Sequence, residues 1–344
     1  MSEQVTVYGA YGHTGRFVVA ELLERGYTAV RAGRDPGKLG GDGRAASVDD
    51  PAALDRALEG SAAVINCAGP FATTAGPVIE AALRAGIPYV DLAAEIEANA
   101  DTFRRYGERA RAEGAVVVPA MAFFGGLADL LATAAMGDWA GADRVDVAYG
   151  LDSWHPTAGT RAAGRVSRER RDGRRVRFVD GRLEYRDDAP PRRRWDFPAP
   201  IGGRDVIAEF SMADIVTLPS HLEVAEVRSH MTVEAAADLA SPETPPPAPA
   251  DGRGRSAQAW AVHVVVHRGA ERRQQVAYGR DIYAVSAPLA VEAVDRILAG
   301  RTKTAGVASA GAMFDAREFL DALAPHVTAA PPACTAPASP PPPR

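Results

Sequence analysis

Three glycines near the amino terminus have the spacing of a phosphate-binding turn. Gly9, Gly12 and Gly15 follow a short apolar run and precede an amphipathic pattern, so the sequence predicts a strand, a tight turn and a helix. Glycines let the backbone approach a pyrophosphate, which would lie on unpaired N–H groups at the helix start. A packing turn that binds nothing is the alternative. The candidate cofactor site also includes the residues between the glycines, which are Tyr11, His13 and Thr14.

The second predicted strand, residues 28–32, ends just before the position that contacts the ribose of a dinucleotide. Arg34 stands about twenty residues after the motif, where dinucleotide-binding folds place that residue. A guanidinium binds a 2′-phosphate, and Lys38 adds positive charge nearby, so the sequence favours NADP(H) over NAD. In one alternative, the strand ends later than residue 32 and Asp35 is the acid that binds the ribose. In another, Arg34 is only a charged residue on the surface.

Strands and helices continue to alternate as far as residue 118, and a six-stranded parallel sheet is expected. Its later strands are predicted at residues 45–48, 62–67, 89–92 and 115–118. Asp49, after the third strand, would contact the adenine or cap the next helix. The turn after the fourth strand, Ala68, Gly69 and Pro70, falls at the carboxyl edge of the sheet, where open α/β folds bind ligands.

Two carboxylates follow the fifth predicted strand. Asp91 and Glu95 fall at its carboxyl end, where a pair of acids would bind a cationic substrate or relay a proton. In the structural alternative, Asp91 accepts hydrogen bonds from backbone donors and Glu95 begins a helix. Both interpretations fit the residues.

These motifs together make the first 125 residues resemble the saccharopine dehydrogenase-like oxidoreductases, a family that includes trans-acting enoyl reductases of lipid and polyketide assembly. A fainter likeness recurs at residues 277–283 and in the helix after them. The resemblance implies an NADP-binding Rossmann domain, with the glycine turn, Arg34 and residues 68–70 around the cofactor. It also implies a second α+β domain that covers the nicotinamide.

A change of pattern near residue 125 marks the predicted domain boundary. Beyond it strands dominate, and turns at Asp172-Gly173 and Asp180-Gly181 are predicted to divide residues 166–185 into a meander. The expected fold is α/β, with an N-terminal doubly wound Rossmann domain and its parallel sheet. A second α+β domain with a mixed or antiparallel sheet follows.

The sequence predicts four segments with different roles. Residues 1–125 and 284–328 would form the Rossmann domain, because the family resemblance implies that the C-terminal helices return to it. Residues 126–283 would form the domain for substrate binding and dimerisation, with a flexible proline-rich loop at 241–256 that is a candidate lid. Residues 329–344 are rich in alanine and proline and are expected to be disordered.

The first candidate for a catalytic acid is His155, in the loop after the predicted strand that ends at Tyr149. A histidine there would reach the cofactor from the second domain and donate a proton, with Tyr149 behind it. The alternative is a loop histidine without a role. His263 and His267 share one face of a strand, but no third ligand is spaced to complete a metal site, so no metal is expected.

Composition sets the class of protein. The chain has 344 residues, 47% of them hydrophobic, and a net charge of −5, which fits a two-domain enzyme. Arginines between residues 161 and 194 are interleaved with acids, as on a solvated face, so no nucleic acid is expected. The longest apolar stretch, residues 115–128, is too broken to span a bilayer. We expect a cytoplasmic homodimer that binds a small-molecule substrate and no membrane.

The expected activity is transfer of a hydride from NADPH to a C=N, C=C or C=O bond. Arg161 and Arg165 are the arginines near a predicted cleft loop that would bind a carboxylate-rich adduct. An apolar acyl substrate would instead need a tunnel, for which the candidate walls are Phe123, Phe124, Trp139 and Trp154. A hypothesis of another class is an NADP-binding regulator or scaffold that lacks catalysis.

Overall fold

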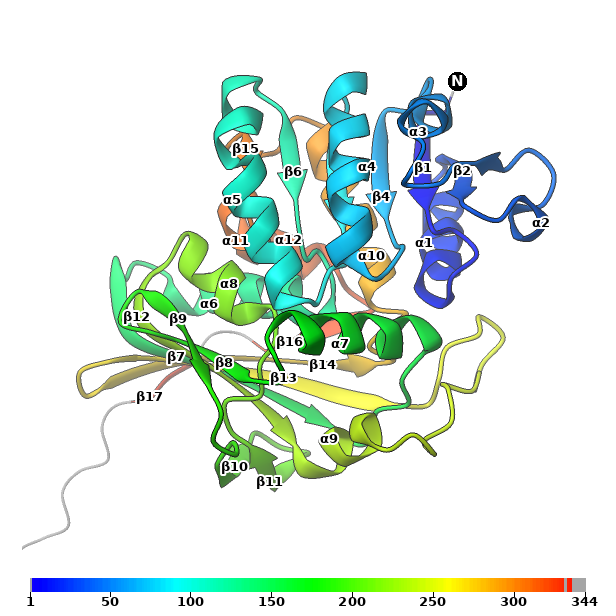
Figure 1. Ribbon diagram of the computed structural model, residues 1–344. Helices are drawn as coiled ribbons and strands as arrows, with labels where there is room; N and C mark the ends of the chain where they lie inside the picture. Colours follow the sequence, from blue (N-terminus) through cyan, green and yellow to red (C-terminus); the bar gives the residue numbers. More distant parts are fainter. Residues whose placement is uncertain (1, 331–332, 336–344) are drawn as a thin grey trace, which may run out of the picture.

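Two sheets organise the chain, one above the other in Figure 1. The computed structural model describes residues 2–330 and 333–335. Within these ranges, the first sheet has seven strands that are all parallel, and the second has ten strands of mixed direction. The fold is therefore α/β, with a Rossmann-like parallel sheet and a second, mixed sheet.

The first sheet has the strand order β15-β6-β5-β4-β1-β2-β3. In chain order its strands are β1 (Gln4–Tyr8), β2 (Thr28–Gly33), β3 (Arg44–Ala45), β4 (Ala63–Asn66), β5 (Tyr89–Asp91), β6 (Val116–Val118) and β15 (Gly306–Val307). The expectation of six strands missed β15, because two residues are too few to produce a pattern; pairing with β6 holds it. The strand order reverses at β1, so the carboxyl ends of β1 and β4 form the edge where such folds bind ligands.

Helices form a layer on each face of this sheet. They are α1 (His13–Glu24), α2 (Pro36–Leu39), α3 (Pro51–Leu58), α4 (Phe71–Ala85), α5 (Ile96–Ala112) and α10 (Ser286–Leu298). The layer of α3, α4 and α5 packs on one face, and α1 packs against α10 on the other. In Figure 1 the arrowheads of β1, β4 and β6 point toward the second sheet, so the ligand-binding edge faces it.

The second sheet has the main strand order β10-β11-β12-β7-β13-β14-β16. Its strands are β7 (Gly141–Leu151), β8 (Arg175–Val179), β9 (Arg182–Arg186), β10 (Arg192–Phe197), β11 (Gly202–Ile207), β12 (Glu223–Thr232), β13 (Ala259–Arg268), β14 (Glu271–Arg280), β16 (Val327–Ala329) and β17 (Ala333–Thr335). The accompanying helical segments are η1 (Phe123–Leu127), α6 (Ala128–Met136), α8 (Asp214–Thr217), η2 (Leu218–Ser220), α9 (Val233–Ala240), α11 (Ala310–Met313) and α12 (Ala316–Ala322). Helix α6 packs on β13 and β14.

The predicted meander over residues 166–185 is wrong in its first part, because residues 166–170 belong to helix α7 (Ala158–Arg170). Thr157 caps this helix by accepting a hydrogen bond from Thr160 N, and its alanines and arginines favour helix over strand. Asp172-Gly173, with positive φ at both residues, follows the helix end and leads into β8. Asp180-Gly181 turns the β8–β9 hairpin, as predicted. Helix α7 contacts α4 and α5, and it lies between the two sheets in Figure 1.

The C-terminal segment divides between the two sheets. Helix α10 and strand β15 join the first sheet's layers, whereas α11 and α12 pack on α6 and β16 pairs with β14. Residues 333–335 pair with β14 as β17, so the expectation of a disordered tail is wrong for these three residues. Residues 331–332 and 336–344 lie outside the described residues.

The proline-rich loop 241–256 is anchored near both ends. Arg161 Nη2 donates to the carbonyl oxygens of Ser241, at 3.1 Å, and Thr244, at 2.8 Å. At the other end, Ser256 N donates to Asp281 Oδ2 at 2.7 Å. The loop is thus tied to α7 and to the segment that follows β14.

Candidate cofactor and active site

The glycine turn at the end of β1 forms a backbone cradle. Gly9 has a φ of 86°, and a Cβ there would lie 2.8 Å from the backbone nitrogen of Ala68. A Cβ on Gly15 would overlap the carbonyl oxygen of Gly9. Gly12, the N-cap of α1, offers no side-chain cap, so the first N–H groups of α1 have no partner in the described part of the chain. These residues fit a bound pyrophosphate.

Arg34 lies directly after β2, which ends at Gly33 as predicted. Its side chain is exposed and has no hydrogen-bond partner among the described residues. Tyr11 lies against Gly33, where a Cβ would come within 2.8 Å of the ring, and Lys38 Nζ is 5.8 Å from the centroid of that ring. Tyr11 and Lys38 therefore lie near the end of β2, which Arg34 directly follows.

Asp35 caps the short helix that follows β2. Its Oδ1 caps α2 by accepting from Gly37 N at 3.1 Å, and its Oδ2 lies 3.2 Å from Lys38 Nζ. Because β2 ends at Gly33, Arg34 and not this acid comes first after the strand.

Tyr8, at the end of β1, lies within electrostatic reach of several groups of this region. Its hydroxyl donates to the carbonyl oxygen of Ala46 at 3.0 Å. Burial raises the pKa of Tyr8 to about 12; Tyr11 and Asp49 also raise this pKa, and Arg34 lowers it. Asp49 is exposed and accepts a hydrogen bond from Ser47 Oγ at 3.3 Å. Arg34 and Asp49 are therefore within electrostatic reach of one hydroxyl.

The turn at residues 68–70 is held by buried polar side chains that the sequence analysis did not single out. Asn66 Oδ1 accepts from Ala68 N at 3.0 Å, and its Nδ2 donates to Tyr89 Oη at 3.1 Å. Thr74 Oγ1 donates to the carbonyl oxygen of Ala68 at 2.5 Å. A polar residue at the end of a wholly apolar strand was the available signal for Asn66.

Asp91 is fully buried, and every hydrogen bond it makes is to the protein's own scaffold. Its Oδ1 accepts from the backbone N–H groups of Ala93, at 3.0 Å, and Ala120, at 2.8 Å. Its Oδ2 accepts from Tyr89 Oη at 2.8 Å. Burial raises the pKa of Asp91 to about 6, against the opposing effect of these donors. This geometry matches the structural alternative for Asp91.

Glu95 lies at the start of α5, but its side chain caps α4. Its Oε1 accepts from Phe71 N at 2.7 Å, and the residue is 5% exposed. Burial raises the pKa of Glu95 to about 7; the hydrogen bond from Phe71 opposes the rise and the charge of Asp91 adds to it. The carboxylate therefore supports the end of the 68–70 turn.

Tyr149 is not brought to the surface of the site. It is fully buried, and its hydroxyl donates to Asp214 Oδ1 at 2.8 Å. Asp214 also accepts from Ser229 Oγ, at 3.0 Å, and Gly125 N, at 3.2 Å, and burial raises its pKa to about 6. The hydroxyl of Tyr149 thus belongs to an internal network that the sequence did not reveal.

His155 lies in the loop between β7 and α7. Its side chain is half-buried, and its ring has no hydrogen-bond partner in the described ranges. Helix α7 passes beside the turn at residues 68–70, because Ala163 Cβ lies 3.9 Å from the position that a Cβ on Gly69 would take. Of the helix's two candidate arginines, Arg165 is exposed, whereas Arg161 is engaged with loop 241–256.

The predicted tunnel walls fill the core. Phe124 packs against Phe123, Tyr149 and Trp154, with ring centroids 4.8, 4.8 and 5.0 Å apart. These rings are at most 7% exposed. Trp139 lies apart from them, between the guanidinium groups of Arg268 and Arg273. Because Phe123, Phe124 and Trp154 lie packed in the core, these three rings give no support to the tunnel that an apolar acyl substrate would need.

Other histidines and several arginines of the second sheet pair with neighbours. His230 and His267 contact the two carboxylate oxygens of Asp146, and His263 accepts from Trp195 Nε1 at 3.2 Å. Within the described ranges, no cluster of histidine, cysteine and acidic side chains has the arrangement of a metal site. Three arginines on β8 and β9 form ion pairs with nearby acids, and these are Arg175, Arg177 and Arg186.

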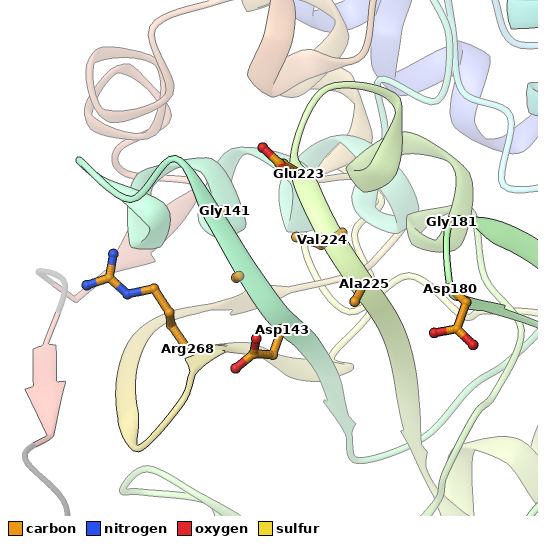
Figure 2. A pocket seen from close by; sticks show the side chains of 9 residues that line it. Gly141, Asp143, Asp180, Gly181, Glu223, Val224, Ala225 and Arg268 are labelled. Carbon is orange, nitrogen blue, oxygen red and sulfur yellow. The ribbon is translucent and has the colours of Figure 1, made fainter.

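A cavity of about 470 Å³ lies on the second sheet, away from the glycine turn and from residues 68–70. Figure 2 shows Asp143, Asp180, Glu223 and Arg268 around it. It is at the Gly141 end of β7, whereas the His155 loop follows the opposite end of that strand. A second cavity of about 660 Å³ lies beside the end of α6 and the start of α12. No predicted site residue lines either cavity.

No helix in the part of the chain that the structure describes combines the length and the apolar character needed to cross a membrane.

Comparison with known proteins places the first domain in a family. Residues 5–118 match the family described as the saccharopine dehydrogenase NADP binding domain. The "Probable mitochondrial saccharopine dehydrogenase-like oxidoreductase" of Arabidopsis thaliana is 28% identical over 142 residues. The "Saccharopine dehydrogenase-like oxidoreductase" of Rattus norvegicus is 26% identical over 153 residues. These matches cover 35% and 37% of this chain and only 31% and 36% of the relatives, or about a third of their length.

A solved structure extends the likeness in fold over nearly the whole chain. The apo saccharopine dehydrogenase (L-Glu forming) of Saccharomyces cerevisiae matches with a TM-score of 0.64 and 12% identity. The match covers 97% of this chain and 100% of that chain, and at this identity it concerns the fold alone. Residues 5–118 thus match the NADP-binding domain of the saccharopine dehydrogenase family, in a chain that is similar over about a third of its length to saccharopine dehydrogenase-like oxidoreductases.

Proposed function

We propose that this protein is an NADPH-dependent oxidoreductase that transfers a hydride to a C=N, C=C or C=O bond of a small-molecule substrate. The observation that carries the proposal is the backbone cradle at the start of α1, whose first N–H groups have no partner within the described residues, with Arg34 exposed at the end of β2. NADPH, when bound, supplies the hydride. The protein supplies binding, orientation and a proton.

The cofactor is held by residues of the first domain. The backbone N–H groups of His13, Thr14 and Gly15 bind the pyrophosphate, and the helix dipole of α1 favours its negative charge. Arg34 binds the 2′-phosphate, with Lys38 close by. The turn at residues 68–70, beside α7, would help to hold the nicotinamide half.

His155 is the proposed proton donor. Its ring has no hydrogen-bond partner among residues 2–330 and 333–335, and its loop leads into α7, which passes beside Gly69. Asp91 and Glu95 are proposed to position the 68–70 turn and its surroundings, because their oxygens already accept hydrogen bonds from the protein. The two acids therefore act on the reaction through backbone geometry.

A fluorescence titration with NADPH and NADH tests the cofactor site. Arg34→Ala should weaken NADPH binding about 10- to 100-fold, the typical loss of a charge-assisted hydrogen bond, and leave NADH binding unchanged. Arg31→Ala, an exposed arginine earlier on β2, is the matched control and should bind NADPH like the wild type. Equal losses for both nucleotides would show that Arg34 does not contact the 2′-phosphate. If neither nucleotide binds, the glycine turn only packs, and the enzyme proposal fails.

The alternative is a catalytically inactive NADP-binding regulator or scaffold. It is favoured by one observation: three of the four predicted catalytic residues, Asp91, Glu95 and Tyr149, are committed to internal hydrogen bonds. Assays of NADPH consumption with imine and enone substrates, on the wild type and on His155→Gln, separate the two proposals. Tight NADPH binding without turnover of any substrate would support the alternative.

The homodimer and the cytoplasmic location expected from the sequence remain predictions. Light scattering of the purified protein should give twice the mass of the 344-residue chain. Because the Arabidopsis relative is named as a mitochondrial protein, cell fractionation should compare the cytosol with any membrane-bounded compartment.

A further inference from the structure

Tyr283, between β14 and α10, joins the glycine turn to the loop that carries His155. We propose that Tyr283 is a positioning residue: its ring packs against His13 of the glycine turn, and its hydroxyl holds residues 154–160 in place. This inference rests on the proposed function, because His155 matters here as the proposed proton donor.

The hydroxyl of Tyr283 has its hydrogen-bond partners in one short segment of the chain. Trp154 Nε1 donates to it at 3.1 Å and Thr157 N donates to it at 3.3 Å. A phenolic hydroxyl accepts two hydrogen bonds and donates one, so these two N–H groups fill its acceptor sites. Its single proton lies between Thr160 Oγ1, at 3.0 Å, and the carbonyl oxygen of His155, at 3.3 Å. All four contacts reach residues 154–160.

The ring of Tyr283 contacts the glycine turn through His13. The His13 ring lies edge-on to it, with centroids 5.3 Å apart and planes at 85°, and also contacts Phe17 at 5.4 Å. His13 Nε2 is buried and has no hydrogen-bond partner among the described residues, so the packing of the two aromatic neighbours helps to fix this ring. The backbone N–H of the same His13 belongs to the phosphate cradle. One residue therefore connects the cradle with Tyr283.

The base of Tyr283 is rigid. Asp281 is fully buried, and its Oδ1 accepts from Tyr283 N at 2.9 Å and Ala284 N at 3.0 Å. Gln258 Oε1 accepts from Ile282 N at 3.1 Å. The backbone on both sides of Tyr283 is thus held, so a displacement of the His13 ring is passed on to the hydroxyl's partners.

A pyrophosphate on the cradle would restrain His13, and through Tyr283 it would restrain the loop that carries His155. Such coupling through packed groups typically changes an equilibrium by about 5- to 150-fold. Cofactor binding would therefore order the proton donor before the substrate arrives.

The first arm of the test measures amide hydrogen exchange by mass spectrometry in the absence of cofactor. His13→Ala removes the ring and should speed amide exchange in residues 154–160 by about fivefold or more. His13→Phe keeps an aromatic ring and should exchange like the wild type. Tyr283→Phe should speed exchange as His13→Ala does. Tyr278→Phe is the matched control, because its hydroxyl on β14 donates to the carbonyl of Ala199 instead.

The second arm repeats the exchange with NADPH. Slower exchange of residues 154–160 in the wild type and in Tyr278→Phe, lost in Tyr283→Phe, supports the coupling. A tyrosine with a merely structural role would not change this ligand-dependent difference. If NADPH binds by fluorescence but exchange of the loop does not slow, the coupling is overturned and the cofactor site stands. If NADPH does not bind, the proposed function fails, and equal exchange in His13→Ala and His13→Phe would overturn the coupling separately.

Discussion

Glu95 Oε1 accepts a hydrogen bond from the backbone N–H of Phe71 at 2.7 Å. Glu95 is the N-cap of α5, and Phe71 is the first residue of α4, so one carboxylate links the starts of two neighbouring helices. Phe71 directly follows the turn at residues 68–70. This hydrogen bond therefore stabilises the carboxyl end of the turn at residues 68–70.

The ionisation of Glu95 should make stability depend on pH. Its pKa rises on folding from 4.5 to about 7, mainly through burial, so its contribution to stability is present below the unfolded-state pKa and is lost as pH rises through 7. Glu95→Gln keeps an oxygen for Phe71 but cannot ionise. Between about pH 4 and pH 8, the free energy of unfolding of the wild type should fall relative to this variant by about 1 to 3 kcal/mol. Urea unfolding at both pH values measures this change, and a constant difference would contradict it.

Gly9→Ala should damage both stability and cofactor binding. Any alanine at a φ of 86° is strained, at a cost of about 1 kcal/mol, and here its Cβ would also clash with the backbone of Ala68. Gly26→Ala is the matched control: φ is 85° there, and nothing lies within 4 Å of the added Cβ. Thermal unfolding and NADPH titration should show a larger loss for Gly9→Ala in both measurements. Equal losses would mean that close packing of the turn is unimportant.

Tyr149→Phe should lower stability without affecting cofactor binding. The change removes one hydrogen bond from the buried Asp214 and should reduce the free energy of unfolding by about 1 to 3 kcal/mol. Tyr185→Phe, at a residue 41% exposed, should change it by less than about 0.5 kcal/mol. Urea unfolding and NADPH titration of both variants check this. A normally stable Tyr149→Phe protein with weaker NADPH binding would refute the internal role.

Arg161→Met should loosen the proline-rich loop. The change frees the carbonyl oxygens of Ser241 and Thr244, which hold the loop to α7. Trypsin should then cleave the loop at Arg253 and Arg255 about tenfold faster, because proteolysis follows the population of open conformations. Arg165→Met, at an exposed arginine on the same helix, should be cleaved like the wild type. Similar rates for all three proteins would show that Arg161 does not restrain the loop.

Several features were predictable because they depend on consecutive residues. The turn at Gly9, Gly12 and Gly15, the end of β2 before Arg34 and the β8–β9 hairpin at Asp180-Gly181 follow from local backbone preferences and hydrophobic periodicity. The same local signal misled at Asp172-Gly173, where the pair follows a helix instead of joining two strands. A turn sequence specifies the turn but not the elements on either side of it.

The amino-acid sequence by itself determined the Rossmann-like first sheet, the glycine turn after β1 and the position of Arg34 after β2. Only the tertiary structure decided which carboxylates, tyrosines and arginines have internal partners. Glu95 meets Phe71, Tyr149 meets Asp214 and His13 meets Tyr283 across loops and sheet pairings that no local pattern encodes. The physical reason is that a side chain's role depends on burial and on its partners, which are set by residues distant along the chain.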